Sequence, residues 1–168
     1  NYDIYLYNLS TETETQITFD ESDQKHPYIH GNKIVYEDFR NGHWEDIYLY
    51  DLSTWTETQI TFDESSQKSP RVHGNRIVWL DSRNGNQDVY LYDLTTETEQ
   101  QITFGESDQN NLGISEDYLV WEQDSDMYLL GFHRSPSGDI TLDGNVDISD
   151  LTKLIDHLFV TWEPLPVP

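Results

Sequence analysis

Apolar and aromatic residues recur in short runs at a regular spacing over the first 132 residues. The run Asp3–Leu9 returns at Asp46–Leu52 and again at Asp88–Leu94, at steps of 43 and 42 residues. A weaker copy, Asp126–Leu130, follows after 38 more residues. Self-similarity at a fixed period indicates a repeat architecture. The pattern therefore predicts several copies of one structural unit.

Four extended segments, rich in Ile, Val, Tyr, Thr and Trp, are expected in each unit. In the second unit of the chain they fall at residues 28–30, 33–38, 46–52 and 58–62. Gly31-Asn32 lies between the first two segments, and Asn41-Gly42 lies between the second and the third. Both pairs favour tight turns, because Gly and Asn tolerate positive φ at little cost. Four strands in a period of about 40–45 residues are typical of a β-propeller blade.

Both faces of the third segment are apolar. In the first copy, Ile4 and Leu6 lie on one face, and Tyr5, Tyr7 and Leu9 lie on the other. A sheet with one face in water would instead alternate apolar with polar residues. The pattern favours units stacked between neighbours over a lone β-sandwich.

Three segments recur at the repeat step: Asp-Ile-Tyr-Leu-Tyr-Asp-Leu, Thr-Gln-Ile-Thr and Gly-Asn-(Lys/Arg)-Ile-Val-(Tyr/Trp). They resemble the TolB-type β-propeller repeats of bacterial and archaeal cell-surface proteins over residues 1–132. The resemblance implies a disc that closes with about six blades, in proteins that bind proteins or glycans or serve as scaffolds. Here two complete blades, at 27–62 and 70–104, lie between a half blade at 3–19 and a three-strand blade at 112–132. The predicted fold is all-β, a β-propeller-type array of four-stranded antiparallel blades, two complete and two partial.

The two partial blades leave strand edges and apolar faces that need a cover. The thirteen strands expected are too few for a closed ring of the usual size. Three answers stay open: the natural protein is longer than this stretch, two chains pool their blades into one six-bladed ring, or copies add head to tail into a fibre. Each of them covers the exposed ends with more propeller.

The composition changes after Phe132, where residues 133–138 form a linker to a C-terminal segment, residues 139–168. This segment opens with a twelve-residue pattern that fits a calcium loop, because oxygen ligands stand at the required positions and Gly144 permits the sharp turn. The expected calcium ligands are Asp139, Thr141, Asp143, Asn145 through its backbone carbonyl, Asp147 and Asp150. A helix with one apolar face is predicted to follow, and Pro164 and Pro166 bar its extension.

The loop and helix resemble one half of a type I dockerin module, in which Asp commonly fills the last ligand position. Thr141 replaces the usual Asp or Asn and removes one charge. A complete dockerin has two such halves packed together, so the apolar helix face needs another partner: the propeller, a neighbouring chain or a missing second half. We expect the folding of this segment to depend on calcium, which offsets the repulsion between its carboxylates.

Composition and charge exclude several partners. The 32 Asp and Glu against nine Lys and Arg give a net charge of −23, which opposes binding to nucleic acid or to an anionic membrane surface. No apolar run approaches the ~20 residues of a membrane span, so no membrane insertion is expected. Cys is absent, which excludes disulfides and thiolate metal sites. Aromatic residues make up 13% of the chain, more than a disordered acidic chain carries, so a folded protein is expected.

Candidate chemistry is sparse. The sequence contains no Gly-x-Ser-x-Gly, no His-Glu-x-x-His and no Gly-rich phosphate loop, so no enzyme is predicted. His30 and His73 recur at one repeat position beside a turn, which favours a structural role. Acidic loops are expected to share one side of the array with an exposed Trp44. They form either a binding surface for a cation, a basic partner or a sugar, or a solvated rim. Asn8-Leu9-Ser10 is a glycosylation sequon with Asn8 as the candidate acceptor.

We therefore expect a non-catalytic extracellular or cell-surface protein with a structural or adhesive role. It is expected to bind itself, as a fibre or a shared propeller, through its incomplete blades and its calcium-stabilised C-terminal segment. The alternative is a ligand-recognition propeller that binds a glycan or peptide and is docked to a scaffold or surface protein by the dockerin-like segment. A more distant alternative is the accessory propeller of a hydrolase. The extracellular location follows from the two resemblances and from the expected calcium.

Overall fold

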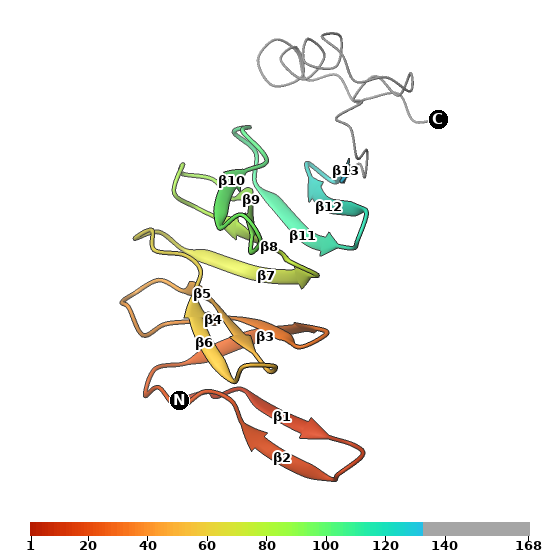
Figure 1. Ribbon diagram of the computed structural model, residues 1–168. Coiled ribbons are helices and arrows are strands. Elements are labelled where there is room, and N and C mark those ends of the chain that lie inside the picture. Colours follow the sequence, from red (N-terminus) through yellow and green to blue (C-terminus); the bar gives the residue numbers. More distant parts are fainter. Residues whose placement is uncertain (133–168) are drawn as a thin grey trace. The chain divides into compact units, whose positions relative to one another are not determined.

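Thirteen strands in four antiparallel sheets make up residues 1–132, the part of the chain that the computed structural model describes (Figure 1). The first sheet contains β1 (Tyr5–Asn8) and β2 (Thr13–Gln16). The second contains β3 (Gln24–His30), β4 (Lys33–Asp38), β5 (Asp46–Asp51) and β6 (Thr56–Gln59). The third contains β7 (Gln67–His73), β8 (Arg76–Asp81), β9 (Asp88–Asp93) and β10 (Thr98–Gln101). The fourth contains β11 (Gln109–Ile114), β12 (Tyr118–Gln123) and β13 (Asp126–Gly131).

Each sheet is a meander, because consecutive strands pair with one another in chain order. The all-β prediction is confirmed for residues 1–132, together with the division into two complete and two partial sheets. The two middle strands of the second sheet lie where the pattern placed them, with β5 one residue shorter. No helix occurs among the described residues, and the predicted linker, calcium loop and helix fall outside them.

The last strand of each complete sheet ends earlier than predicted. β6 occupies Thr56–Gln59 rather than 58–62. The Ile60 N–H still donates to the Ile47 carbonyl over 2.8 Å, but the Ile47 N–H then donates to the Thr61 hydroxyl, also over 2.8 Å. The Thr61 side chain thus replaces the next backbone hydrogen bond of the strand pair. The periodicity of the sequence does not reveal such a replacement. Phe62 is consequently exposed, as are its repeat counterparts Phe19 and Phe104.

The first strand of the second, third and fourth sheets starts earlier than predicted, because it continues through a β-bulge. Between Lys25 and Tyr28 the pairing of β3 with β4 shifts by one residue, and β7 and β11 carry the same irregularity. An extra residue of this kind bends a strand and leaves one position unpaired. The bulge residues have left-handed φ values of 50, 57 and 51°: His26, Ser69 and Asn111. Pro27 and Pro70 follow directly, where a missing N–H is tolerated.

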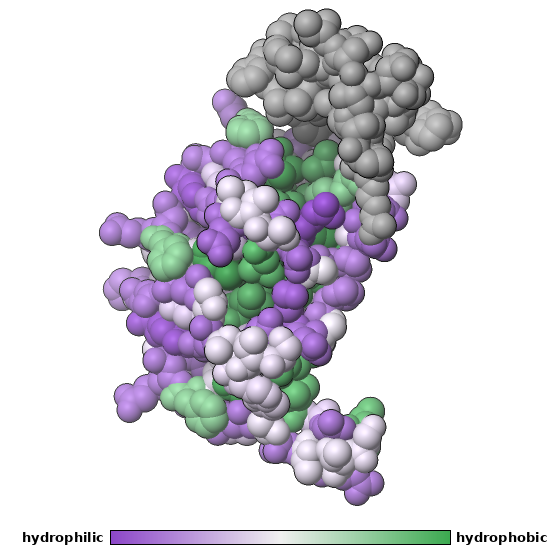
Figure 2. All heavy atoms as spheres, in the orientation of Figure 1, coloured by the Kyte–Doolittle hydropathy of each residue, from purple (hydrophilic) through white to green (hydrophobic). Residues whose placement is uncertain are grey.

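Apolar side chains fill the space between successive sheets, so each interface joins the back of one sheet to the front of the next. Between the second and third sheets, Val35, Ile47 and Leu49 pack with Ile77 and Trp79. The same repeat positions build the interfaces before and after it, where the clusters contain Ile4, Ile17, Ile34, Tyr36 and Tyr48, and Val78, Val89, Leu91, Leu119 and Trp121. Figure 2 shows hydrophobic residues in a strip between largely hydrophilic surroundings. Each large side chain buried in this way contributes roughly 1.5–3 kcal/mol.

The second strand of each of the last three sheets contains one buried aromatic residue. Tyr36, Trp79 and Trp121 are each almost fully enclosed. Each ring stacks on the Tyr directly opposite on the third strand, with centroid separations of 6.1, 6.0 and 5.8 Å. These three residues therefore belong to the core and do not form a ligand-stacking surface.

In each complete sheet one Arg forms ion pairs with two acidic residues, and we call this group of three the charged tie. In the second sheet, the Arg40 guanidinium donates to Asp38 and to Glu57, each over 2.6 Å, and Tyr36 donates its hydroxyl to Glu57. In the third sheet, Arg83 joins Asp81 to Glu99 at 2.6 and 2.7 Å. Since Asp38 and Asp81 are fully buried, the Arg partners are required to keep these carboxylates paired.

Candidate functional site

The first sheet leaves one apolar face uncovered. Tyr5 and Tyr7 occupy the repeat positions of Tyr48 and Tyr50, which pack against the preceding sheet. Tyr5 is 54% exposed, whereas Tyr48 is 5% exposed. Leu9 continues the same face and is also exposed. We call Tyr5, Tyr7 and Leu9 the leading face.

The fourth sheet leaves the opposite kind of face uncovered. Met127 and Leu129 on β13 occupy the repeat positions of Ile47 and Leu49, which pack against the following sheet. Met127 is 67% exposed and Leu129 is 62% exposed, whereas Ile47 and Leu49 are buried. We call Met127 and Leu129 the trailing face.

The leading and trailing faces are the two halves of the interface that occurs three times inside the array. At each internal interface the trailing positions of one sheet contact the leading positions of the next. The first sheet also has an unpaired strand edge. β1 pairs on one side only, whereas β5 and β9, at the same repeat position, pair on both sides. The two faces therefore match one another in chemistry and in repeat position.

A second candidate surface lies where two sets of loops meet. The pairing of Gln24 with Asp38, and of Asp38 with Asp46, places the start of β3, the end of β4 and the start of β5 at one edge of the sheet. The connections between sheets and the loops from each second strand to the third therefore emerge on one side, as predicted. Backbone hydrogen bonds link neighbouring sheets here, such as the Gln67 N–H to the Glu45 carbonyl at 2.9 Å.

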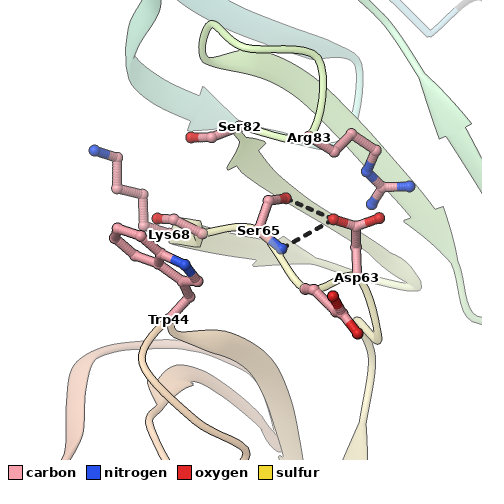
Figure 3. A pocket seen from close by; sticks show the side chains of 8 residues that line it. Trp44, Asp63, Ser65, Lys68, Ser82 and Arg83 are labelled. Atoms are coloured by element: carbon pink, nitrogen blue, oxygen red, sulfur yellow. Dashed lines mark hydrogen bonds between the residues drawn. The ribbon is translucent and has the colours of Figure 1, made fainter.

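A hollow of about 790 Å³ opens between these loops at the junction of the second and third sheets (Figure 3). Its lining includes Trp44 from the loop after β4, Asp63 and Ser65 from the connection between the sheets, and Lys68 from β7. Ser82 and Arg83, in the loop after β8, also line it. In Figure 3, Trp44 and Lys68 lie on one side of the hollow, and Asp63 and Arg83 lie on the other.

Trp44 is exposed, as predicted, and its loop is one residue longer than the corresponding loop of the third sheet. Asp63 accepts hydrogen bonds from the Ser65 N–H and hydroxyl, at 3.0 and 2.7 Å. The hydrogen bonds from the Ser65 hydroxyl and then from its backbone lower the pKa of Asp63, so this carboxylate stays ionised. The Ser65 bonds use one carboxylate oxygen, which leaves the other to accept from a ligand.

The Asn-Gly pairs of these loops end four-residue turns and do not form two-residue hairpin turns: the Gly42 N–H donates to the Phe39 carbonyl at 3.4 Å, and the Gly85 N–H donates to the Ser82 carbonyl at 3.0 Å. Seven residues separate β4 from β5, and Asn41 uses its side-chain amide to donate to Asp46 at 2.9 Å and to the Tyr48 hydroxyl at 3.0 Å. Burial raises the pKa of Asp46, and the hydrogen bonds from Asn41 and Thr61 offset only part of that shift. These polar groups position the loops that line the hollow.

His30 and His73 contact one another across the junction of the second and third sheets. Their ring centroids are 4.0 Å apart, and His30 Nδ1 accepts from the Gly74 N–H at 3.3 Å. Partial burial lowers the pKa of His73, and His30 and Arg76 lower it further. The pair lies at the ends of β3 and β7, opposite to the loops around Trp44.

The other predicted site residues differ in where they fall. Asn8 ends β1 and is exposed, and its side-chain oxygen accepts from the Ser10 and Thr11 N–H groups at 2.9 and 3.2 Å.

All six predicted calcium ligands lie outside the described residues. Within residues 1–132 no group of three or more His, Asp or Glu is placed to hold a metal ion. The same residues contain no helix that could span a membrane.

Sequence reasoning did not single out Lys68, Arg40 and Arg83. Arg40 and Arg83 could have been found from the recurrence of Asp-x-Arg-Asn-Gly, which places a cation two residues after a buried carboxylate in both complete sheets. Nothing in the sequence marks Lys68, because its place beside Trp44 depends on how the two sheets meet.

No family model matches this sequence, and no curated protein matches it. Among solved structures, a protein described as TolB from Agrobacterium tumefaciens superposes with a TM-score of 0.63 at 21% identity, over 77% of this chain and 53% of that chain. TolB from Acinetobacter baumannii gives a TM-score of 0.56 at 22% identity, over 77% of this chain and 37% of that chain.

The same fold also occurs in larger enzymes. An acylaminoacyl peptidase from Pyrococcus horikoshii gives a TM-score of 0.62 at 17% identity and matches 78% of this chain but only 22% of its own length. This chain thus spans about half of the Agrobacterium protein and less of the other two. At these identities the similarity concerns the fold, which is that of a TolB-like β-propeller segment.

Proposed function

We propose that this chain is a non-catalytic structural module that binds further copies of itself through the leading and trailing faces. The observation that carries the proposal is the match between these two exposed faces and the halves of the three internal interfaces. A trailing face of one copy that receives the leading face of the next would continue the same stacking. Such a contact is heterologous, so it produces a ring where the rotation closes and a fibre where it does not.

The apolar content of the two faces supports this assignment. Tyr5, Tyr7 and Leu9 are all more than half exposed, as are Met127 and Leu129. Exposed apolar patches on a soluble protein mark interaction sites, because leaving them in water is unfavourable. With a net charge of −23, association needs such a short-range apolar contribution to overcome the mutual repulsion of two copies.

The titratable groups near the loops support a non-catalytic role. The Arg side chains hold Asp38, Asp81, Glu57 and Glu99 in ion pairs. Asp38 and Asp81 are in addition fully buried, so a substrate in solvent cannot reach their carboxylates. The extracellular or cell-surface location remains part of the proposal and rests on the two sequence resemblances.

Two variants, each blocking one face, test the self-association directly. Tyr7→Asp places a charge in the leading face, and Leu129→Asp places one in the trailing face. In sedimentation velocity of the parent across a concentration series, we expect a dimer that stops growing if a ring forms, or an increasing series of sizes if a fibre forms. Each variant alone is expected to be monomeric, since every contact requires one intact face of each kind.

The mixture of the two variants is the decisive sample. Tyr7→Asp keeps its trailing face and Leu129→Asp keeps its leading face, so the pair should form a 1:1 complex and nothing larger. A parent that is monomeric at all concentrations, or a mixture that contains only monomers, would contradict the proposal.

The predicted calcium site is tested on the full chain. We propose that Asp139 and Asp150, as the first and last loop ligands, hold calcium in the C-terminal segment. Replacing both by Ala should abolish the calcium heat in titration calorimetry, with the thermal unfolding of residues 1–132 unchanged. Unaltered calcium affinity in the double variant would refute the ligand assignment.

A further inference from the structure

The hollow beside Trp44 combines an aromatic ring with polar groups of both signs. Trp44 lies at the edge of the hollow and is 58% exposed, although Trp side chains are highly buried on average in folded proteins. The corresponding loop of the third sheet has no aromatic residue, so repeat architecture does not require this one. Nor does the exposed ring of Trp44 belong to any of the three apolar clusters.

Lys68 supplies the second unusual feature. It lies on β7 and lines the same hollow, yet its ammonium group makes no ion pair or hydrogen bond with the described residues. In contrast, Lys25, at the same repeat position in β3, pairs with Asp23 at 2.6 Å. An ammonium group has three N–H donors, so Lys68 can donate to acceptors of a ligand in the hollow.

The charges of the lining restrict the class of ligand. Asp63 and Glu64 repel an anion, and Lys68 with Arg83 repels a cation. A neutral ligand with many hydroxyl groups satisfies both, because each hydroxyl accepts from Lys68 and donates to a carboxylate. The apolar C–H face of a sugar ring can lie on the exposed indole, as flat apolar surfaces do on aromatic rings.

We propose that the Trp44 hollow is a binding site for a neutral carbohydrate. Trp44 carries one sugar ring, Lys68 donates to its hydroxyl or ring oxygens, and Asp63 accepts from a hydroxyl. The hollow opens on the loop side of the array and is lined by neither the leading nor the trailing face. The site is therefore independent of self-association, and its failure leaves the proposed function untouched.

Three hexasaccharides test the proposal on the full chain: cellohexaose, maltohexaose and chitohexaose, each at millimolar concentration. At least one should quench tryptophan fluorescence in a saturable manner and give a matching affinity in titration calorimetry. Trp44→Ala should weaken that affinity at least about tenfold, because it removes the stacking surface. Lys68→Gln should weaken it by a smaller factor, since the amide keeps fewer donors.

The control is Trp55→Ala. Trp55 is also 58% exposed, but it lies in the turn between β5 and β6 and does not line the hollow. This variant should bind the sugar as the parent does. The proposal is overturned if none of the three sugars binds, if Trp44→Ala binds as well as the parent, or if a basic decapeptide binds at Trp44 while all three sugars fail.

Discussion

The third and fourth sheets have closely related repeats but differ in what surrounds them. Val89 and Leu91 of the third sheet are buried against the fourth, whereas their counterparts Met127 and Leu129 are exposed. The stacked pair of second-strand Trp and third-strand Tyr is present in both sheets. The repeat sequence therefore determines strand pairing within a sheet, and the neighbouring sheet determines burial. This is the behaviour of arrays whose stability is a sum of unit and interface contributions.

The polar structure of the two sheets differs as well. The third sheet has the Asp81–Arg83–Glu99 tie, and its Trp79 Nε1 donates to Asp81 at 3.0 Å. The fourth sheet has Gln123 in place of Asp81 and a two-residue turn, so no tie of this type forms there. The buried Nε1 of Trp121 consequently lacks a hydrogen-bond partner among the described residues. We expect the fourth sheet to be the less stable of the two.

The largest expected effect comes from placing a charge at one repeat position in two surroundings. Leu49→Asp puts an unpaired carboxylate into a buried interface and should lower the free energy of unfolding by about 4 kcal/mol or more. Leu129→Asp, on the exposed counterpart, should change it by less than about 0.5 kcal/mol. Urea unfolding at low protein concentration measures both. Equal effects would show that repeat position, rather than the neighbouring sheet, determines the cost.

A smaller loss is expected from removing the charged tie. Arg83→Met keeps the length of the side chain but leaves the fully buried Asp81 without its cation, which should cost about 3 kcal/mol near neutral pH. The double variant Arg83→Met with Asp81→Asn is the control, and it should be more stable than the single one. If it is less stable, the tie is not what holds Asp81.

Two matched Trp substitutions test the difference in indole hydrogen bonding. Trp79→Phe removes a donor that is paired with Asp81 and should cost more than Trp121→Phe, which removes a donor without a partner. The difference between the two should be about 1 kcal/mol in chemical unfolding, because both variants lose similar apolar area. An equal cost would mean that the Trp121 N–H is satisfied in solution.

The smallest effect concerns the pair of His rings that are in contact between the second and third sheets. The pKa of His73 in the folded chain lies below its ordinary value of 6.5, so the unfolded chain binds the proton more readily. The contribution of His73 to the free energy of unfolding is therefore fully present above about pH 6.5. It decreases as the pH falls from there toward the pKa that His73 has in the folded chain. His30 and Arg76 favour this shift, and Asp117 opposes it.

His73→Asn should flatten that part of the pH dependence between about pH 7 and pH 5, by less than about 0.5 kcal/mol because the pair is largely in contact with solvent. Urea unfolding of parent and variant at each pH gives the difference, in which the background change of the acidic groups cancels. A slope identical in the two chains would exclude His73 as its source.

Much of the fold could be predicted from the sequence, because the signals are local. The period comes from the returning Asp3–Leu9 run, and the Ile, Val and Tyr residues within 33–38 give the second strand as it stands. The end of the fourth strand was misplaced because the Ile47 N–H donates to the Thr61 hydroxyl and not to a backbone carbonyl. The residue type at position 61 does not show which of the two acceptors is used. The first strand was shortened because a left-handed, non-Gly residue such as His26 carries no sequence signal for a bulge.

The candidate surfaces were predictable to different degrees. The apolar character of both faces of residues 3–9 pointed to stacking, but their exposure on one side depends on which sheets are present. Trp44 was recognised as an exposed aromatic residue, whereas its neighbours Lys68 and Asp63 come from segments about 20 residues further along the chain. Such a site depends on the contact between two sheets, which periodicity alone does not describe.

The prolines beside the bulges have a consequence for misassembly. β3, β7 and β11 each form one edge of their sheet, where free backbone groups could pair with a foreign strand. Pro27 and Pro70 remove one N–H from the first two of these edges, but Leu112 stands at the corresponding position of β11 and keeps its own. Among these three edges, β11 is therefore the one most open to a foreign strand, and Leu112→Pro would remove the N–H at the corresponding position.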